Sequence, residues 1–599
     1  MSNLMSLKNI KNNPHRDAFD LSRKFAFTAK LGELLPVLCE DVMPGDKFQI
    51  RTDWFTRTQP VASPAFTRFS EYYDFFFVPY HLLWRHFPQF VIQTDDNNWA
   101  TSIYAGNVKF NTHPYLSRKN VQSFIQSSYT ISNNKLTDKV VQENGLSVAY
   151  GATKLLEYLG YGQFYTKTVE YSTYPNPRGA YSIALDTDEG KNNPAMNPFP
   201  LAAYQKIYND FYRFKQWQTP SPWSYNFDYL QSNNMQVVLP SSYSSSNEPA
   251  YRSGLLTLRS CNYNKDYFTG RLPEKQYGVS AIAAPLLNPD GSLPEFSTLY
   301  SYSSSTAGGS TNTSIGTLLG KSKAGDPSSS SNAAVSLNNL GISALAVRQA
   351  EFLQKWKEIT NSGGTDYVSQ IEKHFGVTPP KADAHLCTYL GGFDKKFGID
   401  EVTNTNLQND AETILRGKGI NGGNGFVEFD VKEHGIIMCI YHVSLLPEYT
   451  TMIANRMNLK TKASDYVIPE LDNIGMQGIS PYEYNGLLRG VNYTDEEIAN
   501  VGSTFLGYVP RYSEYKTAVD KVGGAFSKTL KYWCTPLNTY DQKYVMYGTN
   551  NLHFWIYPGI LNGVFNIEAD STVDSDQFLV NSNFEVRAVR NISRDGLPY

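Results

Sequence analysis

The sequence predicts a mainly β protein, built as an antiparallel sandwich with long inserted segments. Charged residues make up only 18% of the chain, whereas Tyr, Ser, Asn and Gly are abundant. This composition favours strands joined by polar loops. Segments with strand patterning occur near both ends of the chain, and helical patterns lie between them. Strands and helices do not alternate regularly, as they would in a parallel sheet, so an antiparallel sandwich is the simplest arrangement.

Two kinds of strand are predicted. The segment DKFQIRTDWF (residues 46–55) alternates apolar and polar side chains, which indicates one buried and one solvated face. The segment EYYDFFFVPYHLLW (residues 71–84) has no polar face, so it is either a strand covered on both sides or an aggregation hazard. Its candidate core or interface residues are Phe75, Phe76, Phe77 and Trp84. Further strand patterns are FVEFDV, GIIMCIYHV, LHFWIYPG and NFEVRAV.

Helical spacing of apolar residues predicts a few helices between the strands. The segments are residues 153–160, 197–218, 343–359 and 366–376. Pro200 stands where a first-turn proline is tolerated, and Asp366 is a suitable N-cap. Gly160 and Gly376 are expected to end their helices.

Two large insertions and a basic N-terminus complete the predicted organisation. Residues 91–195 are mixed and polar, and residues 279–340 are Ser/Gly-rich and cannot build a core, so the latter form a surface loop or a linker. Residues 1–30 hold six Lys or Arg and two Asp, so six minus two gives +4. A solvated terminus is the ordinary explanation of such a charge. Residues 31–599 are then one domain interrupted by the insertions.

Composition excludes several classes of protein. A net charge of −3 and a pI near 6.3 are not typical of a duplex-DNA binder. The N-terminus lacks the apolar core of a signal peptide, and no apolar run is long enough for a bilayer. The cysteines are widely spaced and odd in number, which indicates buried free thiols in a reducing compartment rather than disulfides or a zinc site. They are Cys39, Cys261, Cys387, Cys439 and Cys534.

No motif for catalysis, a cofactor or a metal stands out. The segment GTLLGKS (residues 316–322) has three residues between its glycines, whereas a phosphate-binding loop needs four and a preceding strand. The nine histidines form no metal signature, and no nucleophile elbow is present. The sequence therefore predicts no enzyme. The many aromatic residues remain, and they can pack in a core, fill subunit interfaces or stack on unpaired bases.

Several blocks of the sequence resemble the major capsid protein of microviruses, the small icosahedral phages with single-stranded DNA genomes. The resemblance points to the gokushovirus-like and Bacteroidetes-associated branch. It runs from about residue 31 to residue 516 in the expected order. The blocks are LLPVLCEDVMPGDKFQIRTDWFTRTQP, YYDFFFVPYHLLW, LAAYQKIYNDFYR, NYNKDYFTGRLPEKQYG, VRQA, HFGVTPPKADAHLCTYLGG, EHG, NIG and YVPRYSEYK.

The resemblance implies an eight-stranded jelly roll and a structural role. It implies a T=1-type icosahedral capsid that assembles through fivefold, threefold and twofold contacts between copies and encloses circular single-stranded DNA. Residues 279–340 become the candidate threefold protrusion, with residues 91–195 as the second candidate. The N-terminal arm would lie inside, and its candidate DNA-facing residues are Lys8, Lys11, Arg16, Arg23 and Lys24.

Other partners follow from the same resemblance. A small basic internal protein would neutralise further phosphate charge, and a minor pilot or vertex protein and a host surface receptor are expected. The protein would be made and assembled in the bacterial cytoplasm and would then reside in the virion.

Two other classes of function are compatible with a β-sandwich. A lectin-like carbohydrate-binding protein would suit the Tyr-rich and Trp-rich loops, but the free cysteines and the missing secretion signal speak against it. A sandwich glycoside hydrolase needs two carboxylates at a defined separation, and no pair is nominated by the sequence.

Overall fold

The protein forms two compact units in a computed structural model, and each is described by itself. One unit comprises Met1–Pro273 with Thr378–Tyr599, and the other comprises Glu274–Val377. The structure describes residues 15–59, 61, 65–92, 112–132, 135–138, 148–162, 164, 170–171, 194–230, 235–240, 254–276, 344–362, 367–377, 385–403, 415–451, 456–472, 475–484, 505–539, 556, 560–561, 564–565 and 576–594.

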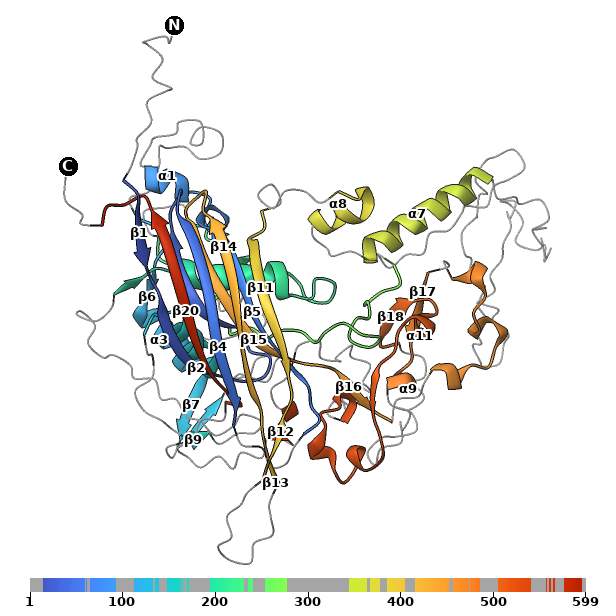
Figure 1. Cartoon of the computed structure of the whole chain (residues 1–599). Coiled ribbons are helices and arrows are strands. Elements are labelled where there is room, and N and C mark those ends of the chain that lie inside the picture. The colour runs from blue at the N-terminus through green and yellow to red at the C-terminus, as the bar shows by residue number, and fades with distance from the viewer. Residues whose placement is uncertain are drawn as a thin grey trace, which may run out of the picture. The chain divides into compact units, whose positions relative to one another are not determined.

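Two antiparallel sheets form the sandwich of the larger unit (Figure 1). The first sheet has the order β1-β20-β4-β14, with β2 also paired to β20. Its strands are β1 (Asp17–Asp20), β2 (Arg23–Ala29), β4 (Lys47–Thr58), β14 (Ile420–Asp430) and β20 (Phe578–Arg590). The second sheet has the order β11-β5-β15-β3. Its strands are β3 (Leu35–Val42), β5 (Phe69–Pro79), β11 (Thr388–Phe397) and β15 (Gly435–Leu445).

The strand order of the sandwich is that of a jelly roll. Without β1, the sandwich has eight strands, which in chain order are β2, β3, β4, β5, β11, β14, β15 and β20. The first sheet pairs the first, eighth, third and sixth of them. The second sheet pairs the second, seventh, fourth and fifth. Consecutive strands thus cross between the sheets, except the fourth and fifth, which pair within the second sheet, as in two interleaved Greek keys. The predicted mainly β antiparallel sandwich is confirmed.

The first sheet has one buried and one solvated face. Along β4 every second residue is buried, from Phe48 to Thr58, and the residues between them face outward. Strand β20 alternates in the same way, with Phe584 and Val586 buried and Arg587 exposed. The period-two pattern that predicted these strands therefore reports a real difference between the faces.

The second sheet is covered on both faces along β5 and β15, whereas its edge strand β11 is partly exposed. All residues of β15 are buried. On the inner side, Tyr73 of β5 shares a hydrogen bond of 2.7 Å with Ser582 of β20, and the Phe77 ring lies 5.1 Å from that of Phe429. On the outer side, the Phe76 ring lies 5.0 Å from that of Phe211 in the π-helical turn Tyr208–Tyr212. The insertion helices thus supply the cover that a segment without a polar face requires.

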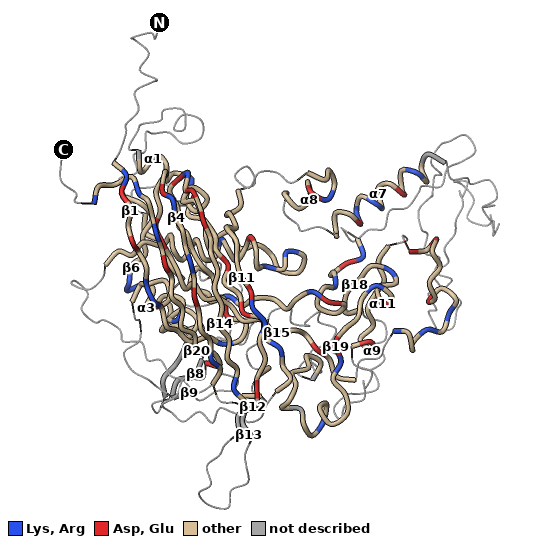
Figure 2. Tube along the Cα trace, in the orientation of Figure 1, with Lys and Arg blue, Asp and Glu red and all other residues tan. Residues whose placement is uncertain are grey.

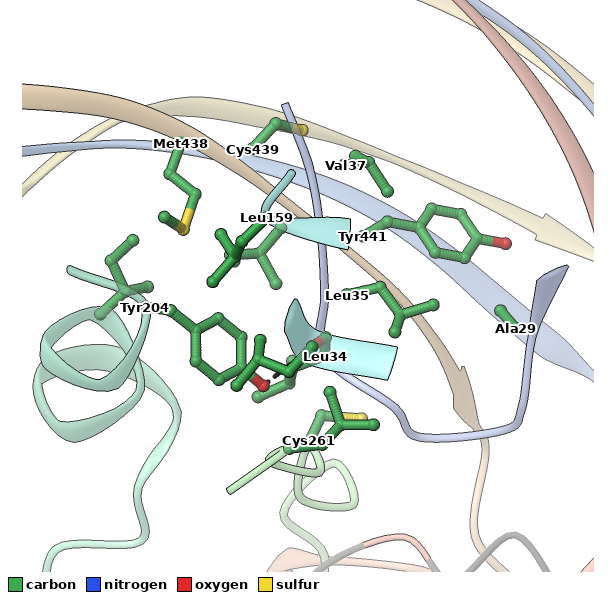
Figure 3. Packing of buried hydrophobic residues seen from close by; sticks show 14 of the residues in the cluster. Ala29, Leu34, Leu35, Val37, Leu159, Tyr204, Cys261, Met438, Cys439 and Tyr441 are labelled. Atoms are coloured by element: carbon green, nitrogen blue, oxygen red, sulfur yellow. Dashed lines mark hydrogen bonds between the residues drawn. The ribbon is translucent and has the colours of Figure 1, made fainter. Parts of the chain in front are cut away.

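Two helices from the long segment between β5 and β11 form this outer cover, α4 (Val148–Tyr158) within the predicted insertion 91–195 and α5 (Phe199–Ile207) after it. Helix α4 packs on β3, and α5 packs on β5 and β15. Figure 3 shows Tyr204 of α5 close to Leu34 and Met438, and its hydroxyl donates to the carbonyl of Leu34 at 2.9 Å. These contacts join the inserted segments and the sheet into one core.

The predicted helices are confirmed, and among the described residues one helix longer than six residues was missed. Gly160 and Gly376 follow α4 and α8 (Tyr367–Phe375) with φ of +82° and +68°, in the left-handed region that glycine favours. Asp366 lies outside the described residues. The helix missed by the sequence patterns is α3 (Arg118–Ser127).

The smaller unit contains α7 (Ala344–Ser362) and α8 (Tyr367–Phe375). His374 of α8 stacks on Trp356 and shares a hydrogen bond of 3.0 Å with Thr360. The apolar spacing that predicted α7 does not mark a buried face, because Phe352 is 68% exposed and Trp356 is 50% exposed.

The remaining elements of the larger unit are short. They are α1 (Phe87–Ile92), β6 (Leu116–Ser117), β7 (Tyr129–Ser132), β8 (Lys135–Asp138), β9 (Glu170–Tyr171), β10 (Ala195–Met196), β12 (Asp400–Thr403), β13 (Leu415–Lys418), β16 (Glu448–Thr450), β17 (Met476–Ile479), α9 (Pro481–Tyr484), β18 (Gly507–Pro510), α11 (Ser513–Lys516) and β19 (Asp520–Val522). Among the described residues, no helix is long and apolar enough to cross a membrane.

Candidate nucleic-acid interface and buried polar clusters

The first sheet presents a regular solvated face formed by five strands. Lys/Arg and Asp/Glu positions are interspersed along its strands (Figure 2). The outward-facing bases and acids are equal in number, five of each. They are Lys24, Lys47, Arg51, Arg57 and Arg587 against Asp20, Asp53, Glu428, Asp430 and Glu585. This face therefore carries no net charge.

Ion pairs account for part of this balance. Lys47 lies 3.5 Å from Asp430, and Arg51 lies 3.5 Å from Asp53. Both pairs are well exposed, so each contributes little to stability. Such a surface attracts phosphate only weakly, because phosphate binding depends on an excess of cations.

Aromatic and amide side chains occupy the same face. Phe55 and Phe426 are exposed there, and the Arg57 guanidinium carbon lies 4.9 Å from the centroid of the Phe55 ring. The register places Asn581 opposite Phe55 and Asn583 opposite Asp53. Exposed rings beside Arg and Asn suit stacking and hydrogen bonding with unpaired bases.

The sequence patterns did not single out these residues. A usable signal was present, because Phe55 occupies the solvated parity of its strand together with Gln49 and Arg51. An aromatic ring at a position predicted to face water is a candidate contact for a partner.

The basic N-terminal candidates have different surroundings. Lys8 and Lys11 lie outside the described residues. Arg16 donates to the carbonyl of Gly45, and Arg23 pairs with Glu40. Lys24 is exposed on β2. Because residues 17–20 and 23–29 are sheet strands, only the segment before Asp17 can be a free arm.

The aromatic candidates belong to the core of the single chain. Phe75, Phe76 and Phe77 are 0%, 2% and 4% exposed, and Trp84 is fully buried. Phe75 packs on Phe393, with ring centroids 5.6 Å apart. Their neighbours come from the same chain, so these residues hold the sandwich together before any subunit contact forms.

A buried carboxylate lies between the two sheets. Glu71 of β5 accepts hydrogen bonds from Trp54 Nε1 at 3.0 Å, Asn421 Nδ2 at 2.6 Å and the Tyr441 hydroxyl at 2.8 Å. The Thr56 hydroxyl is a fourth donor. Burial raises the pKa of Glu71 above its ordinary value, although the four donors oppose the shift.

A second buried cluster joins α4 to both ends of the chain. Lys154 Nζ lies 2.7 Å from Glu33 Oε2 and 2.9 Å from Asp576 Oδ2, and Lys30 Nζ lies 3.7 Å from Asp576 Oδ1. The Tyr150 hydroxyl lies within hydrogen-bond distance of both carboxylates, 3.2 Å from Glu33 Oε1 and 3.1 Å from Asp576 Oδ1, and can donate to either. Lys30, which sequence reasoning counted within the basic arm, is thus a buried structural residue.

Charge pairing sets the pKa values in this cluster. Burial alone would raise the pKa of Asp576, but Lys154 and Lys30 outweigh it and hold that pKa well below its usual range. Burial alone would lower the pKa of Lys154, but Asp576 and Glu33 outweigh it and raise that pKa well above its usual range. Lys154 and Asp576 therefore stay charged at neutral pH, and their ion pair fixes α4 against the start of β20.

In the described part of the chain, no group of three His, Cys, Asp or Glu side chains could hold a metal. All five cysteines are unpaired, as predicted, and four of them are buried. Burial raises the pKa of the Cys39 and Cys261 thiols to about 12, so they are not thiolates at neutral pH.

A family model and two known relatives that match this chain are all capsid proteins. A family model described as "Capsid protein (F protein)" matches residues 8–134 and 183–598. Capsid protein VP1 of Chlamydia phage 1 is 23% identical over 589 residues, which cover 86% of each chain. Capsid protein VP1 of Bdellovibrio phage phiMH2K is 23% identical over 560 residues, which cover 86% of this chain and 84% of that protein. The chain therefore belongs to the capsid protein (F protein) family of the microviruses.

Proposed function

We propose that this capsid protein forms a T=1-type icosahedral shell around a circular single-stranded DNA genome. The observation that carries the proposal is the family match along most of the chain. A jelly-roll strand order, with strands β5 and β15 of the second sheet covered on both faces, supports it. Such a sandwich is a rigid block that can be repeated around closed symmetry axes.

The genome would lie against the solvated face of the first sheet. Phe55, Phe426 and Arg57 would stack on unpaired bases without reading their sequence. Since the described face carries no net charge, phosphate neutralisation has to come from other groups. The basic residues before Asp17 and a small basic internal protein would supply them.

Contacts with a host receptor and with a minor pilot or vertex protein complete the proposal. The smaller unit, Glu274–Val377, contains the Ser/Gly-rich residues 279–340 and would form the threefold protrusion that meets a host surface receptor. A minor pilot or vertex protein would join the shell at its vertices. A carbohydrate-binding role is not favoured by the family match.

The test is to produce the chain with and without single-stranded DNA and a small basic companion protein, and to examine it by electron microscopy and size-exclusion chromatography. Closed shells that protect the DNA from nuclease are expected. Small oligomers alone, under every assembly condition, would overturn the proposal.

A further inference from the structure

We propose that an exposed apolar patch centred on Tyr466 is a contact between neighbouring copies of this chain in the shell. The inference rests on the proposed shell and adds the place where two subunits meet. The patch consists of Met457, Leu459, Tyr466, Val467, Ile468 and Tyr515. These six side chains are 36–57% exposed, although all belong to large apolar or aromatic residues.

The two tyrosines of the patch lie together around one lysine. Lys460 Nζ is 3.9 Å from the centroid of the Tyr515 ring and 5.5 Å from that of Tyr466. The same ammonium group donates to the Tyr515 hydroxyl at 2.6 Å. Residues separated by about fifty positions in the chain are thereby held on one surface.

Polar contacts hold the backbone of the patch in place. Asp465 accepts from the backbone amides of Thr461 at 3.0 Å and Lys462 at 2.9 Å. The backbone amide of Ile468 donates to the Tyr512 hydroxyl at 3.3 Å. The segment is therefore ordered with its apolar side chains outward, and a partner would lose little conformational freedom on binding it.

The exposed area of the patch is large enough to form the centre of a protein interface. Six side chains of this size, each about half exposed, present roughly 500 Å² of mainly apolar surface. One partner of a standard protein interface buries about 800 Å². The patch would thus form most of the centre of such an interface.

The charges around the patch favour a copy of this chain over nucleic acid. The segments that carry the patch, residues 456–472 and 511–516, hold five bases and four acids, so neither sign is in large excess. They are Arg456, Lys460, Lys462, Arg511 and Lys516 with Asp465, Glu470, Asp472 and Glu514. An apolar centre with Tyr and Met and a rim of mixed charge is the usual anatomy of a protein interface. DNA would need an excess of cations, whereas a second copy of a chain with net charge −3 does not.

Oxidative footprinting of the wild-type protein tests the proposal without any substitution. Hydroxyl radicals modify exposed Met and Tyr side chains, so Met457, Tyr466 and Tyr515 are compared in the unassembled chain and in purified shells. If exposure falls from about half to below a tenth, as at an interface centre, modification should fall about fivefold. Tyr73, buried in the single chain, gives the baseline for both samples.

The outcomes separate the two proposals. Equal modification of Tyr466 in shells and in unassembled chains would overturn the patch while leaving the shell intact. A wild-type chain that forms no shell would overturn both.

A matched pair of substitutions supplies an independent test. Val467→Asp would place an unpaired charge in the contact, and the assembled fraction should fall at least about tenfold. Val238→Asp adds the same charge at a valine that is equally exposed but outside the patch, and it should assemble like the wild type. Normal assembly of Val467→Asp, with its fold verified by circular dichroism, would contradict the proposal.

Discussion

Glu71 has the most unusual environment of the residues in the sandwich. It lies on the strand that the sequence marks as lacking a polar face, and it points between the two sheets. Four donors from β4, β14 and β15 converge on it. Since an unsatisfied buried donor costs about 1–3 kcal/mol, the carboxylate fixes the relative position of three strands.

Substitution of Glu71 is expected to separate hydrogen bonding from charge. Glu71→Ala leaves the Trp54 and Asn421 donors unsatisfied and should lower the free energy of unfolding by about 3–5 kcal/mol. Glu71→Gln retains an acceptor and should cost much less. Denaturant unfolding of the unassembled chain measures both changes, and equal losses would contradict the explanation.

The stability difference between the wild type and Glu71→Gln should change with pH in a definite direction. Because burial raises the pKa of Glu71 above its ordinary 4.5, the folded protein holds this proton more tightly than the unfolded chain. The wild type should therefore gain stability relative to Glu71→Gln as the pH falls from 7 towards 4.5, and should lose that gain as the pH rises again. A stability difference that is constant over this range would show that Glu71 does not titrate as described.

Individual charged residues were the least predictable feature of the sequence. Lys30 and Lys154 look like ordinary surface lysines, since their partner Asp576 lies more than 400 positions away in the chain. Local sequence gives no sign of such a pairing. Conversely, the exposure of Tyr466 could not be inferred, because an apolar residue is usually assigned to a core.

At the scale of elements, the strands with two different faces were the most predictable. The alternation in β4 and β20 reflects one local cause, a solvated face beside a buried one. The two-sided burial of β5 and β15 was also indicated by their composition. The covering helices α4 and α5 could not be named in advance, because that pairing depends on tertiary contacts between distant segments.

The attachment of α4 should depend on its buried lysine. Lys154→Met leaves Glu33 and Asp576 buried without their nearest cation, and should lower the free energy of unfolding by about 3–5 kcal/mol at neutral pH. Lys119→Met, at an exposed position on the neighbouring α3, should change it by less than about 0.5 kcal/mol.

The loss caused by Lys154→Met should shrink in acid. The depressed pKa of Asp576 contributes stability above the ordinary Asp value of 3.8, and that contribution is lost as the pH falls through the folded pKa. Without Lys154 the carboxylates are unfavourable while charged, and protonation relieves them. A gap between variant and wild type that widens below pH 5 would refute the role assigned to this cluster.

For the whole molecule, the division into two units predicts what can be removed. Replacing residues 274–377 with a Gly/Ser linker should change the free energy of unfolding of the remaining unit by no more than about 1 kcal/mol, because loop length has a weak effect on stability. Replacing α4 with a similar linker should prevent folding, since α4 covers β3. Thermal unfolding followed by circular dichroism compares the two deletions. If the chain without residues 274–377 failed to fold, the sandwich would depend on the smaller unit.

The position of β20 has a consequence for the synthesis of this protein. It lies between β4 and the N-terminal strands, so residues 17–58 wait for a partner that is translated more than 500 residues later. At about 5–20 residues per second the delay is roughly half a minute to two minutes. During this time an edge of β4 stays open, which is a risk for aggregation and a need for chaperones. A nascent or truncated chain cannot complete the first sheet, so only full-length copies can offer the finished block from which a shell is built.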